Sequence, residues 1–152
     1  MTAKEYLMQI RDYNLAIRRL QENLEELKIN ASGVRAIAYD GVKVQRSAKD
    51  SMTELIAIAD SMEDQIYQKK IRLIALRNQI ITMINCMPDQ RLAEVLYFRY
   101  VRTSGVRPLP MHQVAECLNY KNLKYVTLLH KKALEAFYNQ YKDIIEKDVT
   151  TL

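Results

Sequence analysis

The N-terminal part of the chain repeats apolar and polar positions with a period of seven residues. Apolar residues recur at steps of three and four, and charged residues such as Arg18 and Glu22 fill the other faces. The apolar positions are Ile10, Tyr13, Ile17, Leu20, Leu24 and Leu27. This spacing places one stripe on a helix and is typical of a coiled-coil seam. The pattern predicts a helix over residues 3–29, about 40 Å long at 1.5 Å per residue.

A break and a second seam of the same kind follow. The stretch NASG (residues 30–33) predicts the end of the first helix, with Gly33 as its left-handed C-terminal residue. We expect residues 34–50 to form a loop with a turn at Asp40-Gly41, although the flanking apolar residues would also suit a small hairpin. Those flanking residues are Ile37, Tyr39, Val42 and Val44. A second helix is predicted from residue 51 or 53 to residue 85. Its stripe is Leu55, Ala59, Met62, Ile66, Lys69, Leu73, Leu76, Ile80 and Met83.

Two seams of this kind have two available partners. They can pair with each other as an antiparallel hairpin, or with the same helices of a second chain as a coiled coil. The sequence leaves both arrangements open. Continuous seams on both helices favour a homodimer or higher homo-oligomer, and residues 1–87 are therefore interpreted as a helical hairpin or coiled-coil dimerisation region.

Met87-Pro88-Asp89 predicts the boundary to a second region, residues 88–152. Proline suits the first turn of a new helix, and an acid there suits the helix dipole. The following helix, DQRLAEVLYFRYV, would turn its apolar residues inward and end at Thr103-Ser104-Gly105. The inward positions are Leu92, Val95, Leu96, Phe98 and Tyr100. Residues 106–110 (VRPLP) cannot be helical throughout, because each proline disfavours the helical conformation of the residue before it.

The stretch VAECLNYKNLKYVTLLHKKAL (residues 114–134) breaks its own helical pattern in the middle. A single helix would need apolar residues one turn after Leu118, but Lys121 and Asn122 stand there. Asparagine is a poor interior residue and a good N-cap. A new stripe then runs through Val126, Leu129, Ala133, Leu134, Phe137 and Tyr141. The pattern predicts two helices joined by a short turn, with Tyr120 packing into the core from the turn.

The positive charge of the chain is concentrated around this break. The whole chain of 152 residues has a formal net charge of +5 and a pI near 9.2. Residues 91–132 contain eight basic and two acidic residues, hence a local charge of +6. Such a cluster suits phosphate contact and equally suits a solvated basic face.

The remaining composition narrows the class of protein. Three glycines and three prolines favour long helices over a many-stranded sheet, so the expected fold class is all-α. Cys86 and Cys117 stand far apart, and we expect both to be buried free thiols in a reducing cytoplasm. No apolar run reaches the roughly 18 residues of a membrane span, and the N-terminus has no apolar signal-peptide region. The expected location is cytoplasmic.

The order of features in the C-terminal region resembles the helix-turn-helix of region 4 of bacterial sigma factors. Ala115 stands where the two helices must pack closely, and FRYV (residues 98–101) matches the end of the preceding helix. Nearly the whole chain resembles small RinA/ArpU-like transcriptional regulators of Gram-positive phages and prophages. The segments that carry this wider resemblance are YDGVKVQRS (residues 39–47), IADSMEDQI, VLYFRY and VTLLHKKAL. The family's tryptophan at the start of the first motif helix is replaced here by Met111-His112. The resemblance implies DNA binding, with host RNA polymerase as a further partner.

If the second helix enters the major groove, its outward residues should touch DNA. We expect Lys124 and Lys131 to contact phosphate or guanine, and Thr127 to contact a thymine methyl group. Asn122 would cap the helix or read an adenine edge. We expect His112, Gln113 and Lys121 to contact the sugar-phosphate backbone of the DNA. Tyr125 and Leu128 complete the outward face, and Arg99, Arg102 and Arg107 are candidate phosphate contacts.

The sequence offers no enzymatic constellation. It contains no nucleophile–base pair, glycine-rich phosphate loop or cluster of metal ligands around His112 or His130, so we expect no catalytic residue, metal or cofactor. His130 follows the core stripe and is interpreted as a structural residue. Three hypotheses remain: a sequence-specific regulator that binds double-stranded DNA, a polymerase-binding module without its own sequence readout, and a coiled-coil assembly protein.

Overall fold

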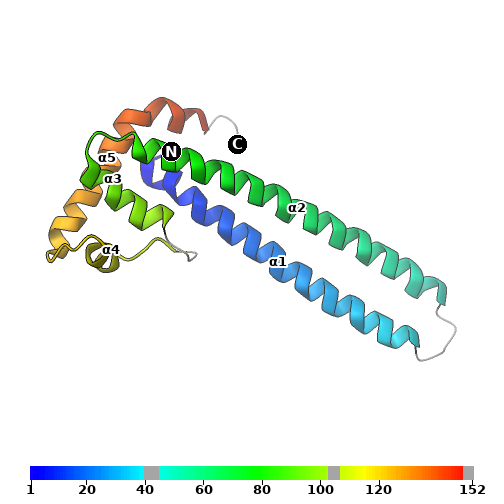
Figure 1. Ribbon diagram of the computed structural model, residues 1–152. Coiled ribbons are helices and arrows are strands. Elements are labelled where there is room, and N and C mark those ends of the chain that lie inside the picture. Colours follow the sequence, from blue (N-terminus) through cyan, green and yellow to red (C-terminus); the bar gives the residue numbers. More distant parts are fainter. Residues whose placement is uncertain (40–44, 103–106, 149–152) are drawn as a thin grey trace. The chain divides into compact units, whose positions relative to one another are not determined.

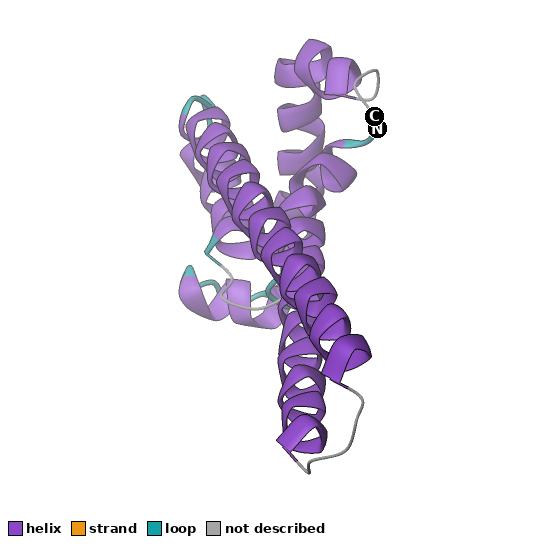
Figure 2. Cartoon of the chain, turned by 90° about the vertical axis from the view of Figure 1, so that its right-hand side faces the viewer, coloured by secondary structure: helices purple, strands orange, loops and turns teal. Residues whose placement is uncertain are grey.

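The computed structural model describes residues 1–39, 45–102 and 107–148, and within these it describes residues 33–39 and 45–50 by their backbone alone. The elements are α1 (Ala3–Tyr39), α2 (Gln45–Asn85), α3 (Gln90–Leu96), the π-helix η1 (Tyr97–Val101), α4 (Met111–Cys117) and α5 (Leu123–Asp148). Throughout these residues the structure contains helices and no strand (Figure 2). The predicted all-α class is confirmed.

The helices form two compact units. One consists of Leu15–Arg72, and the other combines Met1–Asn14 with the chain from Leu73 onward. Residues 1–14 and 73–87, which the sequence analysis grouped with the long helices, therefore share a unit with the C-terminal region. The roles assigned above to residues 1–87 and 88–152 stay a prediction.

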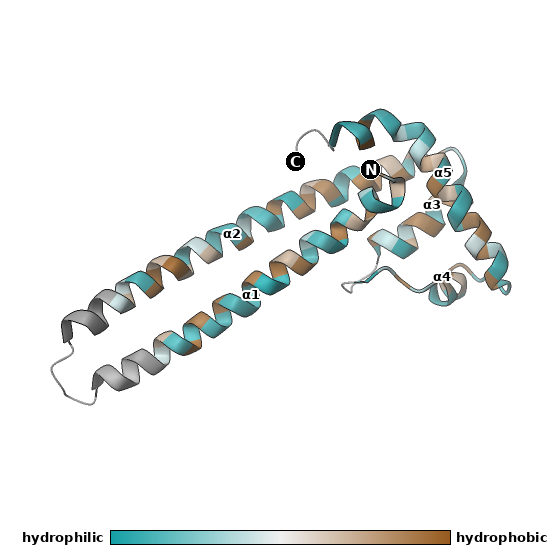
Figure 3. Cartoon of the chain, turned by 180° about the vertical axis from the view of Figure 1, so that it is seen from behind, coloured by the Kyte–Doolittle hydropathy of each residue, from teal (hydrophilic) through white to brown (hydrophobic). Residues whose placement is uncertain are grey.

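In the first unit, α1 and α2 run antiparallel and side by side (Figure 1). Ile17 and Ile66, one from each predicted seam, are both buried. Lys28 and Glu63 also join the two helices, with 3.5 Å between Nζ and Oε1. The two seams, which appear in Figure 3 as recurring hydrophobic positions among hydrophilic ones, thus face each other within one chain.

The predicted inner ends of the long helices are wrong. α1 continues through Gly33 to Tyr39, and α2 begins at Gln45 rather than at residue 51 or 53. A glycine inside a helix costs only about 1 kcal/mol relative to alanine, which a long cooperative helix tolerates. Ile37 and Tyr39 are helical, which contradicts the alternative hairpin. The predicted Asp40-Gly41 turn and the Thr103-Ser104-Gly105 helix end lie outside the described residues.

The core of the second unit gathers the start of α1, the end of α2, α3, η1 and α5. Phe137 is fully buried between Tyr6 and Tyr141, with ring centroids 6.3 and 5.1 Å away. The Tyr6 hydroxyl accepts a hydrogen bond from Gln79, and burial, followed in effect by the charge of Asp148, raises the pKa of Tyr6 to about 12. The Tyr141 hydroxyl, at a kink in α5, donates to the carbonyl of Met83 over 2.6 Å. These contacts fix α5 against the end of α2.

The short elements α3 and η1 connect the end of α2 to the segment that contains the candidate site. Asp89 is the N-cap of α3 and accepts a bond from the Arg91 amide, so Pro88 precedes the helix instead of occupying its first turn as predicted. The helix then widens into η1, where the amide of Arg102 bonds the carbonyl of Tyr97. The predicted inward positions are buried or half-buried: Leu92, Val95, Leu96, Phe98 and Tyr100.

Both cysteines are free, as predicted, but the prediction that they are buried is wrong. Cys86 lies in the turn after α2, and Cys117 ends α4 beyond the buried Val114 and Ala115. Neither position faces a core. Among the described helices, none is long and apolar enough to cross a membrane.

Candidate nucleic-acid interface

The predicted break in residues 114–134 is confirmed: α4 ends at Cys117 and α5 begins at Leu123. The two helices share a hydrophobic cluster made of Val95, Val114, Ala115, Val126 and Leu129. Every member is buried, with relative exposures from 0% to 6%. The small side chain of Ala115 lets α4 approach α5, as expected for its position. The inner face of the first half of α5 is therefore held in the fold, and its other faces are directed away from this cluster.

The turn between α4 and α5 is built by a short sequence with specific backbone needs. Asn119 has a φ of 58°, a left-handed conformation that asparagine tolerates better than most residues. The amide of Tyr120 bonds the carbonyl of Ala115 over 2.9 Å, and the amide of Asn119 bonds that of Glu116 over 3.2 Å. This pair of bonds is a Schellman motif, which closes the C-terminus of α4. Tyr120 packs on the cluster from the turn, as predicted.

The start of α5 is fixed by its own first residues. The Asn122 side-chain oxygen accepts a hydrogen bond from the amide of Lys124 over 3.0 Å. Of the two roles considered for Asn122, the structure thus supplies the capping one. The Thr127 hydroxyl donates to the carbonyl of Leu123 over 2.9 Å, so this donor is already used within the helix.

All nine residues predicted to touch DNA are exposed in the structure. His112 and Gln113 lie in the first turn of α4, Lys121 and Asn122 in the turn, and the others on α5. Those on α5 are Lys124, Tyr125, Thr127, Leu128 and Lys131. Residues 117–134 contain four lysines and no acid. The structure thus brings the predicted residues onto the exposed surface of one helix–turn–helix unit, and this surface is positively charged.

Arg91 belongs to the same surface, although sequence reasoning did not place it in the site. Its Nη1 donates to the Tyr125 hydroxyl over 3.4 Å, and its Nε lies 3.6 Å from the Asp89 carboxylate. The Tyr125 ring also meets the ring of Tyr120 edge-on, with centroids 5.4 Å apart. Tyr125 is therefore positioned from two sides. The only sequence signal for Arg91 was its membership of the basic segment, because the contact joins residues far apart in the chain.

The three arginines predicted as phosphate contacts differ in their surroundings. Arg99 is half-buried, donates to the carbonyl of Leu109 over 2.9 Å, and accepts from the amide of Leu109 through its own carbonyl. It therefore holds the segment before α4 in place. Arg102 is exposed and lies 4.8 Å from the centroid of the Phe98 ring. Arg107 is exposed. Phosphate contact by these three residues stays a prediction.

His130 is half-buried, in agreement with its interpretation as a structural residue. Its Nε2 lies 2.9 Å from the Tyr100 hydroxyl, and the two rings are 5.8 Å apart. Burial, followed by the charges of Arg99 and Lys4, lowers the pKa of His130 to about 4. The ring is therefore neutral near neutral pH. Over the described residues, no three His, Cys, Asp or Glu side chains are grouped so as to hold a metal ion.

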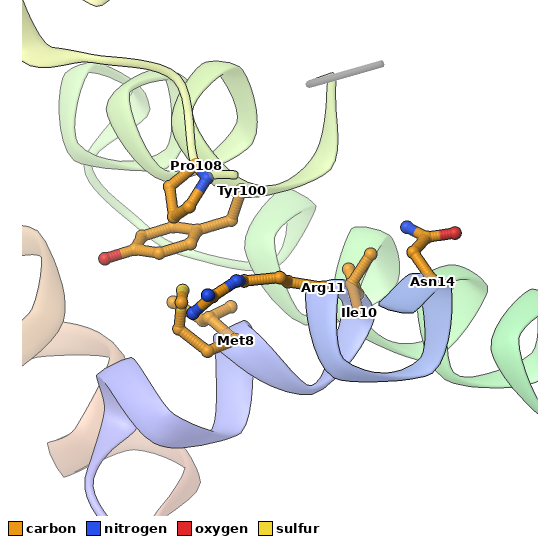
Figure 4. Close-up of a pocket in the computed structure, with 7 residues that line it drawn as sticks. Met8, Ile10, Arg11, Asn14, Tyr100 and Pro108 are labelled. Atoms are coloured by element: carbon orange, nitrogen blue, oxygen red, sulfur yellow. The ribbon is translucent and has the colours of Figure 1, made fainter. Parts of the chain in front are cut away.

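A small cavity lies between the start of α1 and η1. Figure 4 shows the Arg11 side chain extending along it between Met8 and Tyr100, and the Arg11 Nε is buried without a hydrogen-bond partner. The remaining lining comes from Leu7, Ile10, Asn14 and Pro108. Its volume is about 10 Å³, close to the space needed for one water molecule. An organic substrate does not fit there.

No family model, curated protein or solved structure matches this chain.

Proposed function

We propose that this protein binds double-stranded DNA as a sequence-specific transcriptional regulator, with α5 as the helix that enters the major groove. The observation that carries the proposal is the exposed face at the start of α5. Lys124 and Lys131 lie there, no acid interrupts residues 117–134, and the opposite face is locked into a buried cluster. A rigid helix with lysines on its free face suits a groove lined by phosphates.

The helix α4 and the turn before α5 add polar and basic side chains that suit contact with the DNA backbone. His112 and Gln113 start α4, and Lys121 lies in the turn, so these three side chains would meet phosphates on either side of the groove. Arg91 adds a cation beside Tyr125. The use of Asn122 as a cap and the internal bond of Thr127 leave Lys124 and Lys131 as the principal contacts, with the Thr127 methyl group available to a thymine.

The regulatory setting comes from the resemblance described above. RinA/ArpU-like proteins regulate transcription in phages and mobile elements, and we propose the same role here. Leu123, Tyr125 and Leu128 are 36–48% exposed on the same helix, which favours a second candidate: docking of this surface on host RNA polymerase. In this alternative the module would not read a sequence of its own.

The first experiment selects from a pool of random DNA duplexes with the purified full-length protein and sequences what is retained. An enriched motif supports the regulator. The selected duplex then serves in fluorescence anisotropy titrations at several salt concentrations, where phosphate contacts make affinity fall as salt rises. An affinity independent of salt contradicts phosphate-driven binding, and absence of enrichment together with polymerase capture supports the alternative.

Single substitutions locate the surface. Lys124→Ala and Lys131→Ala should each weaken binding, by about 1–3 kcal/mol for a base contact, or reduce the salt slope by about 1 for a phosphate contact. Lys142→Ala is the matched control, since Lys142 is an exposed lysine that lies beyond the kink at Tyr141, far along α5 from the proposed contacts, and pairs only weakly with Glu146, at 3.9 Å. Unchanged binding in both test variants contradicts the assignment of the recognition face.

A further inference from the structure

The helix α2 carries a second apolar stripe, on a face separate from its seam with α1. Ile56, Tyr67 and Ile71 are exposed by 53%, 61% and 44%, respectively. Tyr67 follows Ile56 by three helical turns and precedes Ile71 by about one, so all three lie on one face. All belong to the unit Leu15–Arg72, in which the seam residues Ile17 and Ile66 are already buried. The exposed stripe is therefore not needed to close the α1–α2 hairpin.

The charges along α2 are divided at this stripe. Residues 54–64 contain four acids and no base, and residues 69–72 contain three bases and no acid. The acids are Glu54, Asp60, Glu63 and Asp64, and the bases are Lys69, Lys70 and Arg72. Tyr67 lies between the two groups. A helix with this polarity is complementary to itself when a second copy runs in the opposite direction.

We propose that two copies of this chain associate through the outer face of α2, antiparallel, around a twofold axis beside Tyr67. Tyr67 of both copies then lies at the axis, and Ile71 of each copy lies about one helical turn from it. A twofold interface uses each contact twice, so the Glu63 carboxylate of each copy faces the Lys70 ammonium of the other. Glu63 and Lys70 are two turns apart on the same flank of the stripe, which is the spacing that such a reciprocal pair requires.

The opposite orientation is disfavoured by the same charges. In a parallel pair the acidic segment of one copy would lie beside the acidic segment of the other, and the basic segments would likewise meet. The existing contact of Glu63 with Lys28 does not compete strongly, because both side chains are more than half exposed, at 55% and 62%. This interface leaves the heptad seams paired within each chain and does not depend on DNA binding.

Sedimentation velocity of the full-length protein over a range of concentrations tests the proposal. The natural protein should show a concentration-dependent dimer, and Tyr67→Asp and Ile71→Asp should each sediment as monomers with unchanged helical circular dichroism. Ile58→Asp is the matched control. Ile58 is 48% exposed on the same helix, but helical periodicity places it on the side opposite Tyr67. A natural protein that remains monomeric, or a Tyr67→Asp variant that still dimerises, overturns the proposal.

Charge reversal tests the orientation. Glu63→Lys and Lys70→Glu should each weaken self-association about tenfold, because two reciprocal attractions become repulsions. An equimolar mixture of the two variants should form dimers again, since the two reversed charges then attract each other and the unchanged Lys70 of one copy meets the unchanged Glu63 of the other. Lys28→Ala should leave the dimer intact, which separates the intermolecular role of Glu63 from its intrachain contact. Failure of the mixture to recover overturns the antiparallel arrangement.

Discussion

The half-burial of His130 should make the stability of this protein sensitive to mildly acidic pH. The neutral imidazole can accept the Tyr100 hydroxyl proton at Nε2 over 2.9 Å, whereas a protonated ring has no acceptor to offer. Replacing His130 by Gln removes the titrating group and retains an amide oxygen that can accept from Tyr100. The test compares this variant with the natural protein as the pH is lowered.

The direction of the effect follows from the lowered pKa. The folded-state pKa of His130 is about 4 and its ordinary value is 6.5. Between these two pH values His130 is protonated in the unfolded chain but not in the folded chain, so the free energy of unfolding decreases as the pH falls. The contribution is fully present above pH 6.5 and is lost progressively towards pH 4. At 1.36 kcal/mol per pKa unit its upper limit is about 3 kcal/mol, and partial exposure of the ring reduces this to about 1–3 kcal/mol.

Urea unfolding followed by circular dichroism, repeated at pH values from about 7 to about 4, measures this contribution. Carboxylates titrate in the same range in both proteins, so the difference between natural protein and His130→Gln isolates the histidine. That difference should shift by about 1–3 kcal/mol across the range in favour of the variant. Tyr100→Phe should retain the sensitivity, because burial is the largest cause of the low pKa. Parallel pH profiles for the natural protein and His130→Gln would refute the reasoning.

Three further outcomes are expected. Asn119→Ala should lower the free energy of unfolding by about 1–2 kcal/mol, because the φ of 58° at this position disfavours a Cβ-bearing residue without a polar side chain. Asn119→Gly should not lower it, and urea titration of both variants measures the difference. Phe137→Ala should destabilise by about 3–5 kcal/mol in the same assay, since Phe137 is fully buried, and a loss below about 1 kcal/mol would contradict the core described here. Cys86 and Cys117 are exposed, so both thiols should react with a thiol reagent in the native protein as fast as in the urea-unfolded chain; slow native reaction would mean that they are covered.

Helical periodicity was sufficient to locate the main elements and the break between α4 and α5. It succeeded because a buried stripe must repeat every 3.6 residues, and the interruption at Lys121 and Asn122 cannot be absorbed by one continuous stripe. Local signals for helix ends were weaker. Gly33 was a reasonable stop signal, but one unfavourable residue in a long cooperative helix is outweighed by its neighbours, and α1 passes through it.

The exposed residues of the candidate interface were predictable for the same reason. Once Val126 and Leu129 are assigned to the core, the periodicity of a helix leaves Lys124, Leu128 and Lys131 outside. The sequence could not associate Arg91 with Tyr125, because no local pattern links α3 to α5. Nor could it assign Arg99 its bond to Leu109, which depends on how the chain returns from η1 to α4.

The sequence by itself determined that the chain is helical, where the two seams lie, and that positive charge collects around a turn between two helices. These properties depend on residues close together in the chain. Only the tertiary structure decided that the seams face each other within one chain, that both cysteines are exposed, and that the ends of α1 and α2 join the compact unit of α5. Each of these depends on which apolar surfaces meet across long stretches of sequence, and an amphipathic stripe specifies that it must be covered without specifying by what.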